Sequence, residues 1–192
     1  MTGSAELQLL LGDLYRRSGR LPEAEAVISN LIRAIGWSPA LGSAYAVILQ
    51  EQGRLNLAVV EALRAAAAAP DDAAIVENLV AILLQLGDAV KAQPLILQER
   101  RRSPLDQRWL AYEDTAARLL HDPLYTELYD YRRFVRSFDG PPPPNYASIG
   151  AFNAELLPRL LERHSLRQHP LDQSLRVGTQ TTRSLLGDPD PL

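Results

Sequence analysis

The chain has 192 residues, of which 46% are apolar, and a formal net charge of -3. This apolar fraction argues against a chain that is disordered throughout, and the slightly acidic balance gives no general attraction to nucleic acid or anionic membranes. The complete absence of cysteine excludes disulfide bonds, thiol catalysis and cysteine-ligated zinc, and it favours a reducing compartment.

The N-terminal stretch MTGSAELQLLLGDLYRRSGR lacks the basic region and small-residue cleavage site of a secretory signal, and it is patterned as an amphipathic helix. Polar residues such as Glu77 and Gln85 interrupt the longest apolar runs before they reach membrane-spanning length. Lys91 is the only lysine among 20 basic residues, an arginine bias associated with GC-rich bacterial genomes. We therefore expect a cytoplasmic bacterial protein that does not bind membranes.

A Gly–Ala pair recurs along the first half of the chain at a constant interval. The three pairs are Gly19 with Ala24, Gly53 with Ala58, and Gly87 with Ala92. The interval, about 34 residues, is the period typical of helix–turn–helix repeats that stack into a solenoid. It divides the chain into three units over residues 5–38, 39–72 and 73–106. A helical bundle with accidental spacing is the alternative.

Each unit contains the stop signals of two helices. An apolar-periodic segment runs into each glycine, and a residue just past a helix end needs the left-handed backbone that glycine adopts without strain. The alanine five residues later falls in the first turn of the second helix, where a small side chain permits close crossing. Pro70 and Pro104 end the second helix in two of the units, because proline cannot continue a helix.

These units resemble tetratricopeptide repeats. The first unit carries Gly12 and Tyr15 at that family's helix-packing positions, while Gly36 stands where the family usually has proline. The resemblance implies an all-α, tetratricopeptide-like α-solenoid, followed here by a partial, non-repeat C-terminal segment.

Residues 107–139 are expected to form a degenerate helix pair that caps the array. The pattern LDQRWLAYEDTAARLL over 105–120 predicts one helix, and the aromatic-rich 124–138 predicts a second. The Gly–Ala marker is missing from this pair.

The resemblance also implies a concave groove, lined by the first helix of each unit, that binds a protein or peptide. The groove candidates carried over are Asp13, Arg16, Arg17, Gln50, Glu51, Glu77, Asn78, Leu84 and Gln85. Only Asn78 matches the pattern with which some members hold a peptide's C-terminal carboxylate, so that mode is not expected. A solvated surface packed on a neighbouring domain is the alternative interpretation.

A basic and aromatic cluster extends from Arg100–Arg102 to Tyr125, Tyr129 and Arg133. Arginine beside stackable rings is typical of single-strand binding. Acidic residues are interleaved, however, and the aromatic spacing is that of a core, so we expect no nucleic-acid partner.

Residues 140–146 begin with GPPPP and are expected to be a stiff linker. Beyond it, over 147–192, Ser148 can cap a helix with an apolar stripe at Phe152, Leu156, Leu157, Leu160 and Leu161.

The sequences FNAELLPRLLERH (152–164) and HPLDQSLRVGTQT (169–181) resemble the start of a 2-oxoglutarate/Fe(II)-dependent oxygenase domain found after repeats in bacterial proteins. The specific string comprises Ser174, Leu175, Arg176, Gly178, Thr179, Gln180 and Thr181. The resemblance implies that iron and 2-oxoglutarate would be bound by residues further along than this sequence extends.

We therefore expect no catalytic, cofactor-binding or metal-binding residue in this chain by itself. The histidines His121, His164 and His169 lack the His-x-Asp/Glu spacing of such an iron site. We also expect residues after about 165 to be poorly ordered without their sheet partners. The functional hypothesis is the interaction module of an oxygenase, and the alternative is a free-standing scaffold or adaptor.

Overall fold

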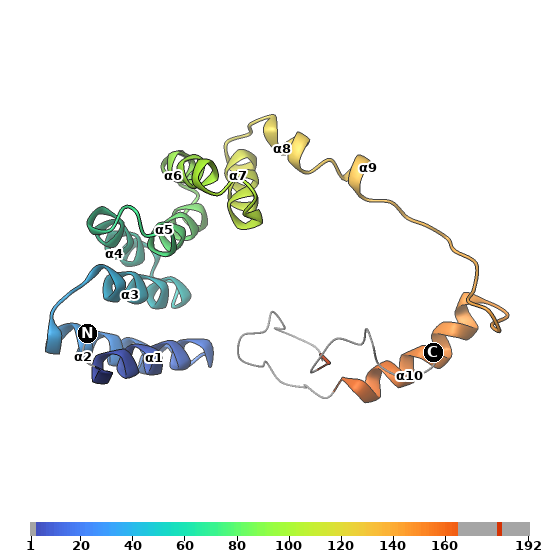
Figure 1. Cartoon of the computed structure of the whole chain (residues 1–192), viewed down its shortest axis with the longest axis horizontal. Helices are drawn as coiled ribbons and strands as arrows, with labels where there is room; N and C mark the ends of the chain where they lie inside the picture. The colour runs from blue at the N-terminus through green and yellow to red at the C-terminus, as the bar shows by residue number, and fades with distance from the viewer. Residues whose placement is uncertain (1–2, 165–179, 182–192) are drawn as a thin grey trace. The chain divides into compact units, whose positions relative to one another are not determined.

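The computed structural model describes residues 3–164 and 180–181, and all of the regular elements in this part of the chain are helices (Figure 1). Contacts between Cα atoms divide the chain into two units, residues 1–135 and 136–192. The oxygenase-like string, apart from Gln180 and Thr181, and the segment expected to be poorly ordered lie outside the described residues. None of the described helices is both long enough and apolar enough to cross a membrane.

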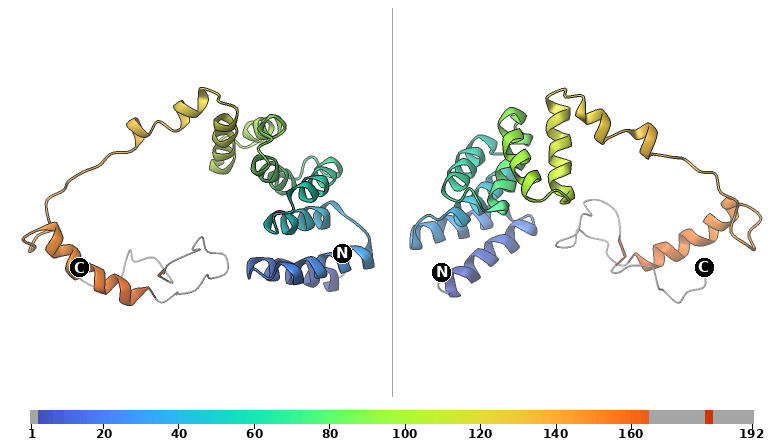
Figure 2. Two further views of the ribbon diagram at one scale, coloured as in Figure 1. Left: turned by 180° about the vertical axis from the view of Figure 1, so that it is seen from behind. Right: turned by 45° about the horizontal axis from the view of Figure 1, so that its top comes forward.

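The first unit is built from consecutive antiparallel helix pairs (Figure 2). The pairs are α1 (Gly3–Arg17) with α2 (Leu21–Ile35), α3 (Pro39–Glu51) with α4 (Leu55–Ala68), and α5 (Ala73–Gln85) with α6 (Ala89–Arg102). Each helix packs on the next, and α1, α3, α5 and α7 (Gln107–Leu119) also contact one another in succession. The odd-numbered helices therefore share one face of the array.

The odd-numbered helices end in the same way in each pair. Gly19, Gly53 and Gly87 have φ values of 76°, 76° and 79°, the left-handed conformation expected just past a helix end. The following residue donates its backbone N–H to a carbonyl five positions back, as from Arg54 to Leu49. After this tight turn, the chain runs back antiparallel and forms the next helix.

Small residues allow the helices of a pair to approach closely. Ala24, Ala58 and Ala92 are completely buried, each in the first turn of an even-numbered helix. A Cβ atom on Gly12 would lie only 2.8 Å from Cδ1 of Ile28, so glycine lets α1 approach α2. The core is continuous from Ala46 through Ile96 to Trp109, as expected of a stacked array.

The start of each odd-numbered helix after α1 is capped by a side chain. Ser38 Oγ accepts the Leu41 N–H, Asp72 Oδ1 accepts the Ala74 and Ile75 N–H groups, and Asp106 Oδ1 accepts the Arg108 N–H. These caps recur at the same interval as the Gly–Ala pairs. The even-numbered helices α4 and α6 end just before Pro70 and Pro104.

The fourth pair differs from its prediction. The single helix expected over 124–138 is wrong, because the segment forms only α8 (Leu124–Leu128) and α9 (Tyr131–Phe134). Asp130 interrupts the helix: its Oδ1 accepts the Arg133 N–H and caps α9. Neither α8 nor α9 has a buried residue, so no packing face holds the two pieces together as one helix.

In the second unit, the described part contains α10 (Ile149–Arg163), which begins where the capping signal predicts it. Ser148 Oγ accepts the Ala151 N–H. Tyr146, just before the helix, packs edge-to-face on Phe152 with ring centroids 5.1 Å apart. Leu157 and Leu161 of the apolar stripe are exposed in this unit.

Candidate functional site

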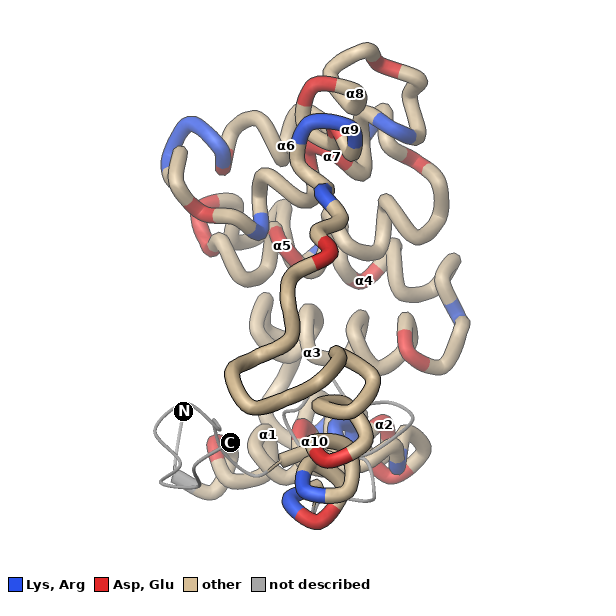
Figure 3. Tube along the Cα trace, turned by 90° about the vertical axis from the view of Figure 1, so that its right-hand side faces the viewer, with Lys and Arg blue, Asp and Glu red and all other residues tan. Residues whose placement is uncertain are grey.

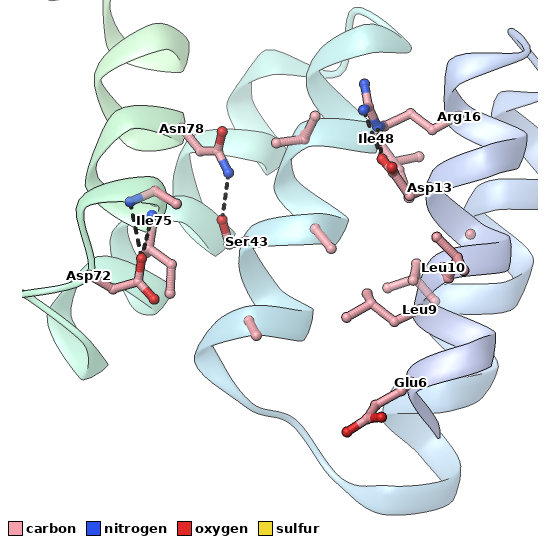
Figure 4. Close-up of a pocket in the computed structure, with 16 residues that line it drawn as sticks. Glu6, Leu9, Leu10, Asp13, Arg16, Ser43, Ile48, Asp72, Ile75 and Asn78 are labelled. Atoms are coloured by element: carbon pink, nitrogen blue, oxygen red, sulfur yellow. Dashed lines mark hydrogen bonds and ion pairs between the residues drawn. The ribbon is translucent and has the colours of Figure 1, made fainter. Parts of the chain in front are cut away.

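The odd-numbered helices of the first unit enclose an open cleft of about 610 Å³. Helix α1 forms one wall, α3 the base, and the start of α5 the other wall (Figure 4). The lining residues, in chain order, are Glu6, Leu9, Leu10, Gly12, Asp13, Arg16, Ile28, Ala40, Ser43, Ala44, Val47, Ile48, Asp72, Ala74, Ile75 and Asn78.

The repeat register determines which side chains reach this cleft. Glu6, Ala40 and Ala74 stand at equivalent positions of successive repeats, and so do Leu10, Ala44 and Asn78. Because equivalent positions of stacked helices point the same way, one position in the repeat contributes a row of side chains across the cleft.

The base of the cleft is apolar, and its rim is polar. Ile28, Ile48 and Ile75 are buried beneath the opening, whereas Leu10 on the α1 wall is 54% exposed. Because Ala40 and Ala44 on α3 have small side chains, the base of the cleft lies below its two walls. An exposed leucine beside a shallow apolar base is a surface on which a partner's apolar side chain can displace water.

Hydrogen bonds join neighbouring odd-numbered helices at a constant sequence offset. Asn78 Nδ2 donates to Ser43 Oγ (2.9 Å), Gln50 Nε2 to Gln85 Oε1 (2.8 Å), and Tyr112 Oη to Glu77 Oε1 (3.4 Å). Arg16 Nη1 likewise donates to Glu51 Oε1. Each pair is separated by 35 residues, one more than the repeat. These four bonds form a polar ladder, which sets the stagger of the helices that line the cleft.

The α1 end of the ladder is a charge cluster. Asp13 accepts from both Arg16 and Arg17, and Arg16 also contacts Glu51. Burial opposes ionisation of Asp13, but the hydrogen bonds from Arg16 and Arg17 outweigh it and lower the pKa of this carboxyl. Burial also opposes the charge on Arg16, and its bonds to Asp13 and Glu51 raise the pKa of the guanidinium. The only cation among the cleft-lining residues is thus engaged by two carboxylates.

The groove candidates proposed from sequence are distributed over the ladder and the cleft. Asp13, Arg16 and Asn78 line the cleft. Arg17, Gln50, Glu51, Glu77 and Gln85 bond to other residues of the odd-numbered helices, and Leu84 packs against the core. Their role in binding a partner stays a prediction.

Sequence reasoning missed the N-terminal half of the cleft, notably Glu6, Leu10 and Asp72. The signal for Glu6 and Leu10 was present, because they lie seven and three residues before Asp13 on the same helix face. Asp72 lies just before α5, so its place on the cleft follows from the stacking of the helices.

Part of the basic and aromatic cluster is bonded to other side chains of the first unit. Arg100 pairs with Glu113 at 2.9 Å, and Arg102 contacts both Asp71 and Glu99. Tyr125 and Tyr129 stack on each other with centroids 6.0 Å apart. Positive and negative segments are interspersed along the tube of the first unit (Figure 3). Within the described part of the chain, no three His, Asp or Glu side chains are grouped as metal ligands would be.

No protein-family model matches the sequence, and a search of curated proteins finds no match. Among solved structures, the chain is similar to a mutant of MamA and to MamA MSR-1 C2, at 16% and 17% identity respectively. Both matches have a TM-score of 0.55 and cover 68% of this chain and 74% of the MamA chain. MamA is a tetratricopeptide-like protein. The chain therefore has an all-α, tetratricopeptide-like helical repeat fold.

Proposed function

We propose that this chain is a protein-interaction module, and that it binds a peptide segment of a partner protein in the cleft between α1, α3 and α5. The observation that carries the proposal is the open cleft itself, whose apolar base and exposed Leu10 lie on the shared face of the odd-numbered helices. Its volume falls within the range of about 300–1,000 Å³ that is common for ligand sites.

The ladder supports this proposal because it holds the walls of the cleft in place before a ligand arrives. Ser43 is buried and bonded to Asn78, and Arg16 is fixed between Asp13 and Glu51. A preformed site loses less conformational entropy on binding than one that must be ordered by its ligand. The cysteine-free composition favours a reducing compartment, and we place this interaction in the cytoplasm.

The binding test uses selection followed by a blocking substitution. Phage-displayed random peptides are selected on the purified chain, and their affinities are measured by fluorescence anisotropy. Ala44→Arg places a long side chain across the base of the cleft and should weaken the selected peptides by at least about tenfold.

The matched control is Ala67→Arg, the same substitution at an exposed position of α4 that does not line the cleft. It should leave the affinity unchanged. Equal affinity for the wild-type protein and the Ala44→Arg variant, with both variants folded by circular dichroism, would rule out the cleft as the binding site.

A finer hypothesis connects the module to catalysis. It is that the repeats present a substrate or partner to a 2-oxoglutarate/Fe(II)-dependent oxygenase domain. It rests on the resemblance of residues 152–164 and 169–181, of which the string from Ser174 to Thr181 is the specific part. Reading the gene beyond Leu192 tests it. A His-x-Asp pair followed by a distal His would support the hypothesis, and a following domain without them would favour a scaffold or adaptor. This chain alone should not convert 2-oxoglutarate to succinate with Fe(II), and detectable turnover would contradict that expectation.

A further inference from the structure

The charges around the cleft are unbalanced at one end. Three carboxylates line it, those of Glu6, Asp13 and Asp72, against the single guanidinium of Arg16. Asp13 and Arg16 neutralise each other, and their further contacts with Arg17 and Glu51 are also mutually compensating. The charge left over in the cleft is therefore negative, and it resides on Glu6 and Asp72.

Both of these carboxylates stand near the beginnings of their helices. Glu6 is in the first turn of α1, and Asp72 is the N-cap of α5. Figure 4 shows them on opposite sides of the cleft, with α3 between them. Within the described residues, neither carboxylate forms an ion pair. At the starts of α3 and α5, the Leu41 N–H is bonded to Ser38, and the Ala74 and Ile75 N–H groups are bonded to Asp72.

Only one of the two oxygens of Asp72 is occupied by capping. Oδ1 accepts the N–H groups of Ala74 and Ile75 at 3.0 and 3.2 Å, whereas Oδ2 accepts no hydrogen bond from a described residue. Because a carboxylate oxygen has more than one acceptor site, Asp72 can keep its cap and accept a further donor.

The α5 wall of the cleft offers a hydrogen-bonding group for a peptide backbone. Asn78 uses one amide hydrogen on Ser43, and its carbonyl oxygen accepts no hydrogen bond from a described residue. The buried side chains of Ile48 and Ile75 contribute to the apolar base. The cleft thus presents an apolar base, an amide on its α5 wall and carboxylates at one end.

We infer that the partner segment bound here is a peptide in which a Lys or Arg stands next to a leucine-sized apolar residue. The apolar side chain lies on the base of the cleft, and the cation lies at the end of the cleft that Glu6 and Asp72 flank from opposite walls. This rests on the proposed peptide-binding function and deepens it, because it specifies the sign of the charge that the partner carries. A segment bearing acidic residues would meet uncompensated carboxylates and would be rejected.

The test uses three fluorescein-labelled synthetic peptides that differ only in their central residues: a Leu–Lys–Leu peptide, a Leu–Glu–Leu peptide and a Ser–Lys–Ser peptide. Affinities for the full chain are measured by anisotropy. The Leu–Lys–Leu peptide should bind at least about tenfold more tightly than either of the others, since each control removes one of the two complementary interactions. Added salt should weaken the binding of the Leu–Lys–Leu peptide.

The charge contribution is tested by the double variant Glu6→Gln and Asp72→Asn. Asparagine remains an effective N-cap and glutamine a good helix former, so the fold is retained. This variant should lose about five- to tenfold in affinity for the Leu–Lys–Leu peptide. The matched control is Glu23→Gln with Asp71→Asn, which removes the same charge in the first turn of α2 and just before α5, outside the lining of the cleft. It should bind like the wild type.

Equal affinity for the Leu–Glu–Leu and Leu–Lys–Leu peptides would overturn the inference, as would equal loss of affinity in the two double variants. If none of the three peptides binds but selected peptides bind in an Ala44-dependent way, the inference fails and the proposed function stands. If selected peptides are also insensitive to Ala44→Arg, the proposed function fails with it.

Discussion

His121 occupies the position that glycine holds in the three preceding units. It follows Gly87 at the repeat interval and has a φ of 55°. The N–H of Asp122 bonds to the Ala117 carbonyl, the same turn that follows the other three glycines. The repeat therefore continues structurally through α7 after its sequence marker has disappeared, with a non-glycine residue held in a left-handed conformation.

Replacement of His121 by glycine should stabilise the array. The side chain is exposed, and a left-handed backbone costs a residue with a Cβ atom more than it costs glycine. Part of this gain is offset by the greater freedom of glycine in the unfolded chain, which leaves about 0.5–1 kcal/mol. Urea unfolding, monitored by circular dichroism, measures this gain in the free energy of unfolding.

Gly53→Ala serves as the reciprocal control, because it introduces the same strain at a φ of 76° and should cost about 1 kcal/mol. A His121→Gly variant that is less stable than the wild type would contradict the assignment of strain.

Asp114 stands where the other units place Gly12, Ala46 and Val80. Its side chain is buried in α7, and its Oδ1 has no hydrogen-bond partner among the described residues. Burial raises the pKa of this carboxyl above its ordinary value, with Arg118 opposing the shift. The folded state thus holds this proton more tightly than the unfolded state does.

Asp114→Ala should stabilise the fold by about 1–3 kcal/mol at neutral pH, because it removes a buried, unsatisfied polar group. Since the folded-state pKa is raised, the cost of the charge is fully present above that pKa and disappears as the pH falls below the ordinary value of 3.8. The difference in unfolding free energy between Asp114→Ala and the wild type should shrink over the same pH range. Urea midpoints measured across this range test it, with Asp114→Asn as the control that removes only the charge. Destabilisation by Asp114→Ala at neutral pH would show that the carboxylate is satisfied in solution.

At the scale of the helices, the polar ladder holds the odd-numbered elements in register. Its central rung, Ser43 with Asn78, is better shielded than the rung formed by Gln50 and Gln85, because Ser43 is buried. A buried donor or acceptor left without its partner costs more than an exposed one, so the two rungs should differ in strength.

A double-mutant cycle between Ser43→Ala and Asn78→Ala should give a coupling energy of about 0.5–1.5 kcal/mol in urea unfolding. The same cycle with Gln50→Ala and Gln85→Ala should give less, because water replaces exposed bonds readily. Equal coupling in the two cycles would mean that burial of the central rung contributes nothing to holding α3 against α5.

The elements of the repeat could be predicted from sequence because their signals are local and periodic. The left-handed turns at Gly53 and Gly87 and the stops before Pro70 and Pro104 follow from backbone chemistry alone. The division of 124–138 into α8 and α9 could not be predicted in this way. Apolar spacing there indicated one helix. Because no buried face stabilises such a helix, it is interrupted where Asp130 caps α9.

The candidate site was predicted less completely than the fold. Its helices and its face followed from the repeat, but the role of Glu6 and Asp72 depends on which charges remain unpaired after packing. Arg16, Arg17, Glu51 and Asp13 compensate one another only because α1 and α3 lie side by side at a stagger that the sequence does not state. Asp72 caps α5 in the structure, and its position on the cleft emerges from the stacking of the helices.

At the scale of the whole molecule, one register produces both architecture and site. The repeat places small residues where helices cross. It also places glycine or His121, with a left-handed backbone, just past the end of each odd-numbered helix from α1 to α7. It also directs one row of side chains from α1, α3 and α5 into a common cleft. The second unit, with α10, lies outside this register. The central claim is therefore that binding occurs on the face of the odd-numbered helices.

Nuclear magnetic resonance titration of the isotope-labelled chain with a selected peptide tests that claim most directly. The largest chemical-shift changes should fall on cleft residues such as Leu10, Ala44 and Ile75, with little change on the exposed face of α4. If the largest chemical-shift changes fall on α4, α6 or α10 and the shifts of the cleft residues do not change, the claim is contradicted.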